Sequence, residues 1–472
     1  MGPGPHPSRR FFFAAPDAPD ARRWYEGRMP WLTTRRLALA ALAAWLAVAA
    51  LNLVLGPPLG HDEAAFAVIA RGEQPPGAWL YRSDGTVALA RLGVALGGAA
   101  WQLRIASALL GASIVAAAFA VGRAAFGART GAWAAAVIAG AHPMALRSAQ
   151  LLGDLPAAAC VLGGIAALAG ELDREAGPRW RVAAAAPLFA AAFYLRYGSA
   201  PAIAVALAAA GLVWRRAIAA RPLPALGVLA ALAALAVPHL VRSHGATGSA
   251  FGILEISAGM PRRAYLGEGL VTYLTSEPLR FYGVLVAPAM AAGLLGVVRT
   301  RRRAPWYLAI VALGQLVALG VQSHGQSRYV FVAVVLLVVL GVDAAARLAR
   351  PRLALAAVAA AWLGVAGASV AVCRRLEQQR APIVAAGGAL RGDAAGRPCA
   401  VVAAVAPQLA WYSRCQVYLA SQLAAPIPAD RVRYAVALAH DSIDPGAIAA
   451  LHQLRAVPVA TGDPAARAWR LE

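Results

Sequence analysis

The sequence predicts an all-α polytopic membrane protein of about eleven transmembrane helices, with a small α/β domain at its C-terminus. Hydrophobic residues make up 60% of the 472 residues and charged residues only 14%, and the mean hydropathy is +0.61. Soluble domains are about half apolar and about one quarter charged. Apolar runs of near-spanning length recur from residue 37 to residue 372. Residues 373–472 instead alternate short β-like and helix-like runs, which is typical of α/β domains.

The first element, residues 1–36, is rich in Pro and Arg and has no apolar core. It is similar to the positively charged start of a signal peptide, but the apolar run that follows is long enough to remain in the membrane. No small-residue cleavage pattern stands out. We therefore expect residues 1–36 to be a disordered cytoplasmic tail.

The transmembrane domain, residues 37–372, is a series of apolar runs, several of them short or interrupted by Gly and Pro. Each run is long enough, or nearly so, to cross the hydrocarbon core as a helix. The predicted spans are 37–55, 103–122, 131–147, 154–170, 182–197, 199–213, 223–241, 279–298, 306–322, 329–346 and 353–372.

Arginine clusters between these runs determine the predicted orientation, because loops rich in Arg and Lys stay in the cytoplasm. The N-terminus is then cytoplasmic, and an odd number of spans places the C-terminal domain outside, together with two long loops at 56–102 and 242–278. The cytoplasmic clusters lie within 9–36, 123–129, 174–181, 215–221, 299–303 and 347–352. We expect a multi-pass protein of the cell (plasma or inner) membrane.

The net charge of +22 and the pI near 11.2 would suggest nucleic acid in a soluble protein. Here the charge lies between apolar runs, so we assign it to topology and to contact with anionic membrane lipid, with no nucleic-acid partner. The chain contains no Lys, which excludes phosphate-loop, Schiff-base and general-base lysines. The zinc-protease, thioredoxin and serine-hydrolase motifs are absent too, so no sequence motif indicates one of these soluble enzyme classes.

The C-terminal domain contains Cys399 and Cys415, which would lie in an oxidising compartment if the predicted orientation holds. Disulfides persist in such compartments. A Cys399–Cys415 disulfide and two unpaired buried thiols both remain open at this point. Strands are expected at Cys399–Val405, Val432–Ala439 and Ala456–Ala460, and helices at Pro407–Arg414 and Pro445–Leu454.

Three acidic residues stand at the predicted outer ends of spans. Asp62 and Glu63 follow the first span, and adjacent carboxylates beside hydrocarbon usually serve chemistry or ion handling. Asp62 could instead cap the short helix that follows it, but the second carboxylate would then be unexplained. Asp154 precedes Leu155 and Pro156 at the start of the fourth span, where it too could begin a helix.

Two arginines also lie at the predicted outer surface. Arg196 lies in the turn between two spans, and Arg328 starts another. A guanidinium binds phosphate oxygens through paired, charge-assisted hydrogen bonds, although either side chain could simply extend to the membrane interface. His324 lies near Arg328. No spacing among Asp62, Asp154 and His324 demands a divalent metal, which nevertheless remains open.

The loop at 242–278 includes Arg262, Arg263 and Tyr265 among apolar residues. Such a segment can lie at the membrane interface as an amphipathic lid or contact an acceptor. A structured loop without a gating role is the alternative.

The order of these features resembles the glycosyltransferase-C superfamily, in particular its protein O-mannosyltransferase-like and lipid A aminoarabinose-transferase-like enzymes. The resemblance covers residues 37–350 and is strongest over 60–215. It rests on an ordered set: Asp62-Glu63, the stretches Leu103–Gly111 and Gly122–Gly127, Pro143, and the stretch Arg147–Asp154.

This resemblance implies transfer of a hexose or pentose from a polyprenyl-phosphate donor to a protein, glycan or glycolipid acceptor on the outer face. It implies that Asp62 is the general base, that Glu63 supports it and that Asp154 is a further site residue. No cofactor is implied. The first loop has no lysine for the donor phosphate, so the candidates for that role are Arg71, Arg82, Arg196 and Arg328.

The residue types suit this chemistry. A carboxylate within about 3 Å of the acceptor hydroxyl can take its proton, which is worth about 10²- to 10⁴-fold in rate. The phosphate leaves as an anion and needs arginine donors rather than a general acid. In-line attack predicts inversion at the anomeric carbon. A transporter or lipid flippase and a non-catalytic scaffold for envelope assembly are the alternatives.

Overall fold

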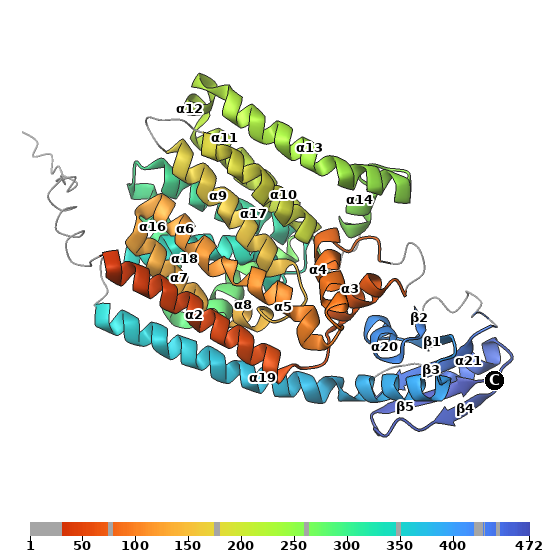
Figure 1. Cartoon of the computed structure of the whole chain (residues 1–472). Helices are drawn as coiled ribbons and strands as arrows, with labels where there is room; N and C mark the ends of the chain where they lie inside the picture. Colours follow the sequence, from red (N-terminus) through yellow and green to blue (C-terminus); the bar gives the residue numbers. More distant parts are fainter. Residues whose placement is uncertain are drawn as a thin grey trace, which may run out of the picture.

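The computed structural model describes residues 31–73, 79–173, 180–258, 264–345, 351–419, 428, 430–439 and 444–472. Residues 1–30 of the predicted cytoplasmic tail lie outside this set. Figure 1 shows a helical bundle and a small sheet domain beside it, connected by one long helix, α19 (Pro351–Ala394). The prediction of a mostly helical protein with a small C-terminal α/β domain is confirmed.

Helices form most of the bundle because its residues are rich in Ala and Leu, which have high helix propensity. Four helices lie in the two long loops, α3 (His61–Arg71) and α4 (Asp84–Ala95) in the first and α14 (Gly252–Ala258) and α15 (Glu268–Thr275) in the second. The bundle consists of α2 (Trp31–Leu55), α5 (Ala100–Gly111), α6 (Ser113–Phe126), α7 (Ala128–Ala139), α8 (His142–Arg147), α9 (Asp154–Leu172), α10 (Ala185–Leu195), α11 (Ala200–Val213), α12 (Arg215–Ala220), α13 (Pro222–Thr247), α16 (Glu277–Arg299), α17 (Arg303–Gln322), α18 (Phe331–Ala345) and the first part of α19, with 3-10 turns η1 (Trp180–Ala184), η2 (Tyr197–Ser199) and η3 (Ser327–Val330).

Seven helices in the described residues are long and apolar enough to cross a membrane, and three shorter apolar helices accompany them. The number of eleven spans stays a prediction. One predicted span, 131–147, is not a single helix. It is divided into α7 and α8 at Gly140, because Pro143 has no backbone N–H to continue the hydrogen-bond ladder.

The centre of the bundle is α18, in which every residue from Phe331 to Gly341 is buried. Other helices surround it, and close approaches between helices occur at glycines. Gly122 of α6 faces Gly131 of α7 so closely that a Cβ on either would meet backbone atoms of the other helix. Helices α13 and α19 lie at the edge, with large apolar side chains such as Leu223 and Leu363 exposed.

The C-terminal domain contains one five-stranded sheet in the order β2-β1-β3-β5-β4. Strand β1 is parallel to β2 and β3, whereas β5 is antiparallel to β3 and β4. The end of α19 packs on the sheet through Ala386 and Leu390, so this helix belongs to both domains. The elements are β1 (Cys399–Ala403), α20 (Ala406–Ser413), β2 (Gln416–Leu419), β3 (Val432–Leu438), α21 (Pro445–Leu451), β4 (Ala456–Val459) and β5 (Ala466–Leu471).

Candidate functional site

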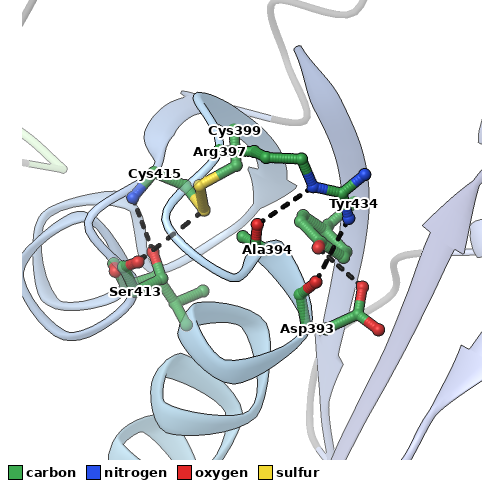
Figure 2. The surroundings of a disulfide bond; sticks show 8 residues. Asp393, Ala394, Arg397, Cys399, Ser413, Cys415 and Tyr434 are labelled. Atoms are coloured by element: carbon green, nitrogen blue, oxygen red, sulfur yellow. Dashed lines mark hydrogen bonds between the residues drawn. A yellow bond between two sulfur atoms is a disulfide. The ribbon is translucent and has the colours of Figure 1, made fainter.

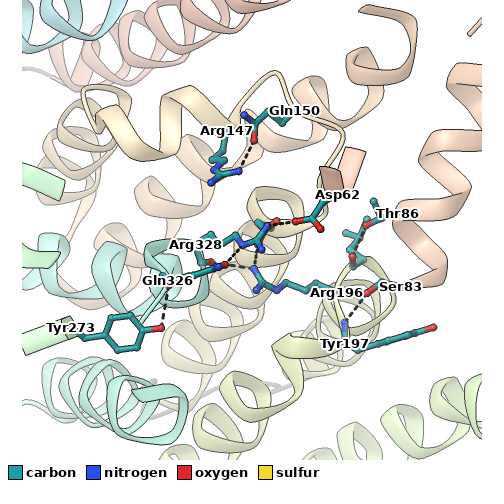
Figure 3. A network of polar contacts seen from close by, with 12 residues as sticks. Asp62, Ser83, Thr86, Arg147, Gln150, Arg196, Tyr197, Tyr273, Gln326 and Arg328 are labelled. Carbon is teal, nitrogen blue, oxygen red and sulfur yellow. Dashed lines mark hydrogen bonds and ion pairs between the residues drawn. The ribbon is translucent and has the colours of Figure 1, made fainter. Parts of the chain in front are cut away.

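Asp62 lies in the first turn of α3, but it is not the N-cap residue of this helix, which is Gly60. Its carboxylate instead lies between two arginines. Oδ1 accepts a hydrogen bond from Nη1 of Arg82 at 2.8 Å, and Oδ2 accepts one from Nη1 of Arg328 at 2.8 Å. The side chain keeps 26% of its surface exposed, so a reactant can still reach it. Figure 3 shows Asp62 and Arg328 facing each other.

The two arginines determine the charge of Asp62. Burial by itself would raise the pKa of this carboxyl, but the charges and hydrogen bonds of Arg82 and Arg328 outweigh burial and hold its pKa below the usual range. Asp62 is therefore an anion at neutral pH. As long as both arginines hold it, it is also a weak base.

Glu63, next in the chain, points into the protein and is 2% exposed. Its Oε1 accepts from Nε of Arg104 at 2.7 Å and from the backbone N–H of Leu151 at 3.0 Å. Its Oε2 accepts from Nη2 of Arg104 at 3.0 Å and from the N–H of Gly60 at 2.8 Å. Burial would raise the pKa of Glu63, but Arg104 outweighs it and lowers this pKa. With both oxygens occupied, Glu63 connects α3 to α5 and the segment before α9.

Asp154 begins α9 and forms an ion pair with Nη1 of Arg196, which follows α10. The same Nη1 donates to the backbone carbonyl of Arg328 at 3.2 Å. Asp154, Arg196, Arg328 and Asp62 thus form one continuous set of contacts from four separate segments. Figure 3 shows Arg196, Arg328 and Asp62 of this set. The guanidinium of Arg196 is a cation at neutral pH, as arginine is throughout the pH range of proteins.

A pocket with about 280 Å³ of free volume, part of it open to solvent, begins at these groups. The ring of Tyr329 lies beside both arginines, 4.6 Å from Cζ of Arg196 and 5.6 Å from Cζ of Arg328. Asp62 does not line the pocket itself and is connected to it through Arg328. The pocket is lined by Asp154, Ala158, Val161, Arg196, Gly198, Ser199, Ala202, Gln315, Arg328, Tyr329, Phe331 and Val332.

Gln315 of α17 lines the pocket, and its polar side chain lies among apolar neighbours. The residue is 2% exposed, and its Oε1 has no hydrogen-bond partner in the part of the chain that the structure describes. A buried acceptor without a partner costs about 1–3 kcal/mol. A ligand or water that donates a hydrogen bond here would remove this cost.

Arg147 is a cation that the sequence reasoning did not assign to the site. Its Nη1 donates to Oε1 of Gln150 at 2.8 Å, and it has no carboxylate partner among the described residues. Its place in the stretch Arg147–Asp154, on which the resemblance rests, was the available signal. Arg104 was missed too, although a charged residue in an apolar run signals a buried partner.

Other candidates lie elsewhere. Arg71 is at the far end of α3, with its guanidinium stacked on Trp411 of the C-terminal domain, and the structure does not bring it to Asp62. Arg262 and Arg263 lie outside the described residues, and Tyr265 is exposed. No group of three or more His, Cys, Asp or Glu side chains among the described residues is placed to hold a metal ion.

The two cysteines of the C-terminal domain form a disulfide. Cys399, the first residue of β1, is bonded to Cys415, just after α20, with their Cα atoms 4.7 Å apart. Figure 2 shows this bond between the strand and the end of the helix. Cys160 and Cys373 are free thiols.

Comparisons with known proteins support the fold. The sequence model of the dolichyl-phosphate-mannose-protein mannosyltransferase family matches residues 85–241, which include Arg104, Arg147, Asp154 and Arg196. A search of curated protein sequences found no match.

Solved structures match almost the whole chain. ArnT from Cupriavidus metallidurans in the apo state is 17% identical with a TM-score of 0.69, over 96% of this chain and 98% of ArnT. ArnT bound to undecaprenyl phosphate is 18% identical with a TM-score of 0.66, over 92% and 97%. The archaeal oligosaccharyltransferase AglB from Archaeoglobus fulgidus, in complex with an inhibitory peptide and a dolichol-phosphate, is 13% identical with a TM-score of 0.52, over 83% and 65%.

At these identities the structural likeness establishes the fold. The resemblance that the sequence predicts is therefore confirmed: the chain has the glycosyltransferase-C fold of ArnT over nearly its whole length, and residues 85–241 match the dolichyl-phosphate-mannose-protein mannosyltransferase family.

Proposed function

We propose that this protein is an integral membrane glycosyltransferase that moves a sugar from a polyprenyl-phosphate donor to an acceptor on the outer face, with inversion and with Asp62 as general base. The observation that carries the proposal is the cluster around Asp62, where a partly exposed carboxylate lies among arginines beside a pocket in an apolar bundle. The sugar is a hexose or pentose, and the acceptor is a protein, glycan or glycolipid.

The charge of the cluster suits the donor phosphate. The cluster contains four arginines and two carboxylates, Asp62 and Asp154, which leaves an excess of two positive charges. A polyprenyl-phosphate sugar is a phosphodiester with one negative charge, and the phosphate it leaves behind has nearly two at neutral pH. The cluster therefore neutralises the leaving group better than the donor, which stabilises the transition state selectively. The four arginines are Arg82, Arg147, Arg196 and Arg328.

Donor binding also prepares the base. The phosphate competes with Asp62 for Arg328, which faces both the carboxylate and the pocket. When Arg328 turns to the phosphate, Oδ2 of Asp62 loses its hydrogen bond and the pKa of Asp62 rises toward the ordinary carboxyl range. Asp62 then takes the proton of the acceptor hydroxyl as the acceptor oxygen bonds to the anomeric carbon and the bond to the phosphate oxygen breaks.

The test uses the purified protein in lipid vesicles with labelled polyprenyl-phosphate sugars and envelope extract as the source of acceptor. Asp62→Asn should lower transfer by at least about 100-fold, the lower value for general-base catalysis. Asp84→Asn is the matched control, because Asp84 lies in the same loop but pairs with Arg242 outside the cluster. Equal transfer by wild type and Asp62→Asn would refute the assignment of the base, and an unchanged anomeric configuration in the product would refute inversion.

A further inference from the structure

Helix α20 of the C-terminal domain packs against α3, the helix of Asp62 (Figure 1). The contact begins at the end of α3. The guanidinium of Arg71 lies over the ring of Trp411, with Cζ 3.4 Å from the ring centroid, and its Nη2 donates to the carbonyl of Trp411 at 3.1 Å. A stacked cation and a hydrogen bond to the same residue hold the C-terminal turn of α3 on α20.

A second contact holds the other end of α3. The backbone N–H of Leu59, three residues before Asp62, donates to Oη of Tyr412 at 2.8 Å, and Leu59 is fully buried. Arg380 of α19 donates to the carbonyl of Pro58 beside it. The C-terminal domain thus holds the segment that leads into α3 through its backbone N–H and carbonyl groups. These contacts do not depend on the side chains of that segment.

A third contact lies just past both helices. Nη1 of Arg414 donates to Oε1 of Glu73 at 2.9 Å. Arg414 ends α20 in the left-handed backbone conformation with φ of 65°, which is unfavourable for a residue other than glycine. The next residue is Cys415, and its bond to Cys399 ties the end of α20 back to β1. The disulfide therefore closes a ring that contains the whole of α20.

Helix α3 needs such support because it has only 11 residues. Isolated helices of this length are marginal in water, so tertiary contacts must hold α3 in place. Glu63 supplies these contacts from inside the bundle, and α20 supplies them at both ends. The base must be accurately placed, since a displacement of about 1 Å can cost about 100-fold in rate.

We infer that the C-terminal domain is a brace for the reaction centre, in which Trp411 and Tyr412 are positioning residues for Asp62 and the Cys399–Cys415 disulfide keeps α20 in the bracing position. The inference rests on the proposed function for its effect on catalysis, but the brace itself can be measured without any transfer assay. It gives the domain a role in the protein's own reaction.

The first experiment measures backbone amide exchange over residues 56–73 in the full-length protein. Tyr412→Phe removes one hydroxyl and should raise exchange there by about twofold to tenfold, the value of one hydrogen bond. Tyr434→Phe is the matched control, because its hydroxyl donates to Asp393 within the C-terminal domain. Trp411→Ala should raise exchange in the same residues, and Trp411→Phe should restore much of the protection because it keeps an aromatic face.

Transfer kinetics on the same variants separate positioning from general loss of stability. Trp411→Ala should lower kcat by at least about tenfold without weakening the affinity for undecaprenyl phosphate, because the arginines remain in place while Asp62, which competes with the phosphate for Arg328, shifts. Raised exchange in the α20 variants of a protein that transfers no sugar would support the brace and refute the proposed function. Unchanged exchange over 56–73 in both Tyr412→Phe and Trp411→Ala would overturn the brace, whatever the activity.

The disulfide is tested with a reductant. Reduction of the wild type should raise exchange over both 406–413 and 56–73, and should have no further effect on the double variant Cys399→Ser with Cys415→Ser. The free thiols Cys160 and Cys373 are present in both proteins and serve as an internal control. If reduction raised exchange over 406–413 alone, the disulfide would have no part in bracing α3.

Discussion

Replacing Glu63 by methionine is expected to destabilise the folded protein by about 3–5 kcal/mol, the usual cost of removing one partner of a buried ion pair. The side chain accepts four hydrogen bonds, two from Arg104 and one each from the N–H groups of Leu151 and Gly60. A methionine fills a similar volume but accepts none of them effectively. The charge of Arg104, a residue that is 1% exposed, would then stay buried without a counter-charge.

A double-mutant cycle gives the magnitude of this pair. Arg104→Met alone leaves the carboxylate of Glu63 buried without a partner and should cost a similar 3–5 kcal/mol, whereas the two methionines together remove both charges. The double variant should therefore cost no more than one single variant, so it should be at least about 3 kcal/mol more stable than the sum of the single effects predicts. Glu73→Gln is the control, because the side chain of Glu73 is 32% exposed and pairs with the exposed Arg414 as well as with Arg71, and ion pairs open to solvent contribute about 0–1 kcal/mol.

The assay is equilibrium unfolding in detergent micelles, followed by the loss of helical signal as denaturant is added. The free energies of unfolding of wild type, the two single variants, the double variant and Glu73→Gln are compared under one condition. Single effects below about 1 kcal/mol, or additive effects of the two methionines, would refute the view that this pair fixes α3 in the bundle.

The remaining predictions concern the donor and its pocket. Arg147→Gln should weaken the binding of undecaprenyl phosphate by about tenfold or more, the value of a hydrogen bond to a charged group, whereas Arg71→Gln should leave this affinity unchanged, as titration calorimetry can show. In the free protein the pKa of Asp62 is lowered, so its carboxylate stabilises the fold at pH above about 3.9, the unfolded value, and this contribution is lost as the pH falls toward the folded value. The acid limb of kcat/KM should accordingly lie below about pH 3.9, and the acid limb of kcat, which is measured with donor bound, should lie at a higher pH. Coinciding acid limbs would contradict the proposed preparation of the base. Gln315→Leu should leave the free energy of unfolding unchanged or raise it by about 1 kcal/mol, because it removes a buried unpaired acceptor, and should weaken donor binding if a donor hydroxyl occupies the pocket.

Much of the fold follows from the sequence because membrane helices are encoded locally. Apolar runs predict helices whatever the rest of the chain does, since lipid leaves the backbone no partner but itself. The helices and strands that the sequence did not predict correctly are those with weak local signals. Strands β2 and β5 went unpredicted, because the first has only four residues and the second is interrupted by arginines at positions 467 and 470. The division of span 131–147 depended on one proline.

The sequence by itself also predicted which side chains bear chemistry: two acids in the first loop, a third at a span end, and arginine as the proposed phosphate ligand in a chain without lysine. Only the tertiary structure decided which of them meet. It placed Asp62 between Arg82 and Arg328, and it stacked Arg71 on Trp411 of α20. These partners lie from 20 to more than 260 residues away from Asp62, and such distances are closed only when helices pack, which no local pattern encodes.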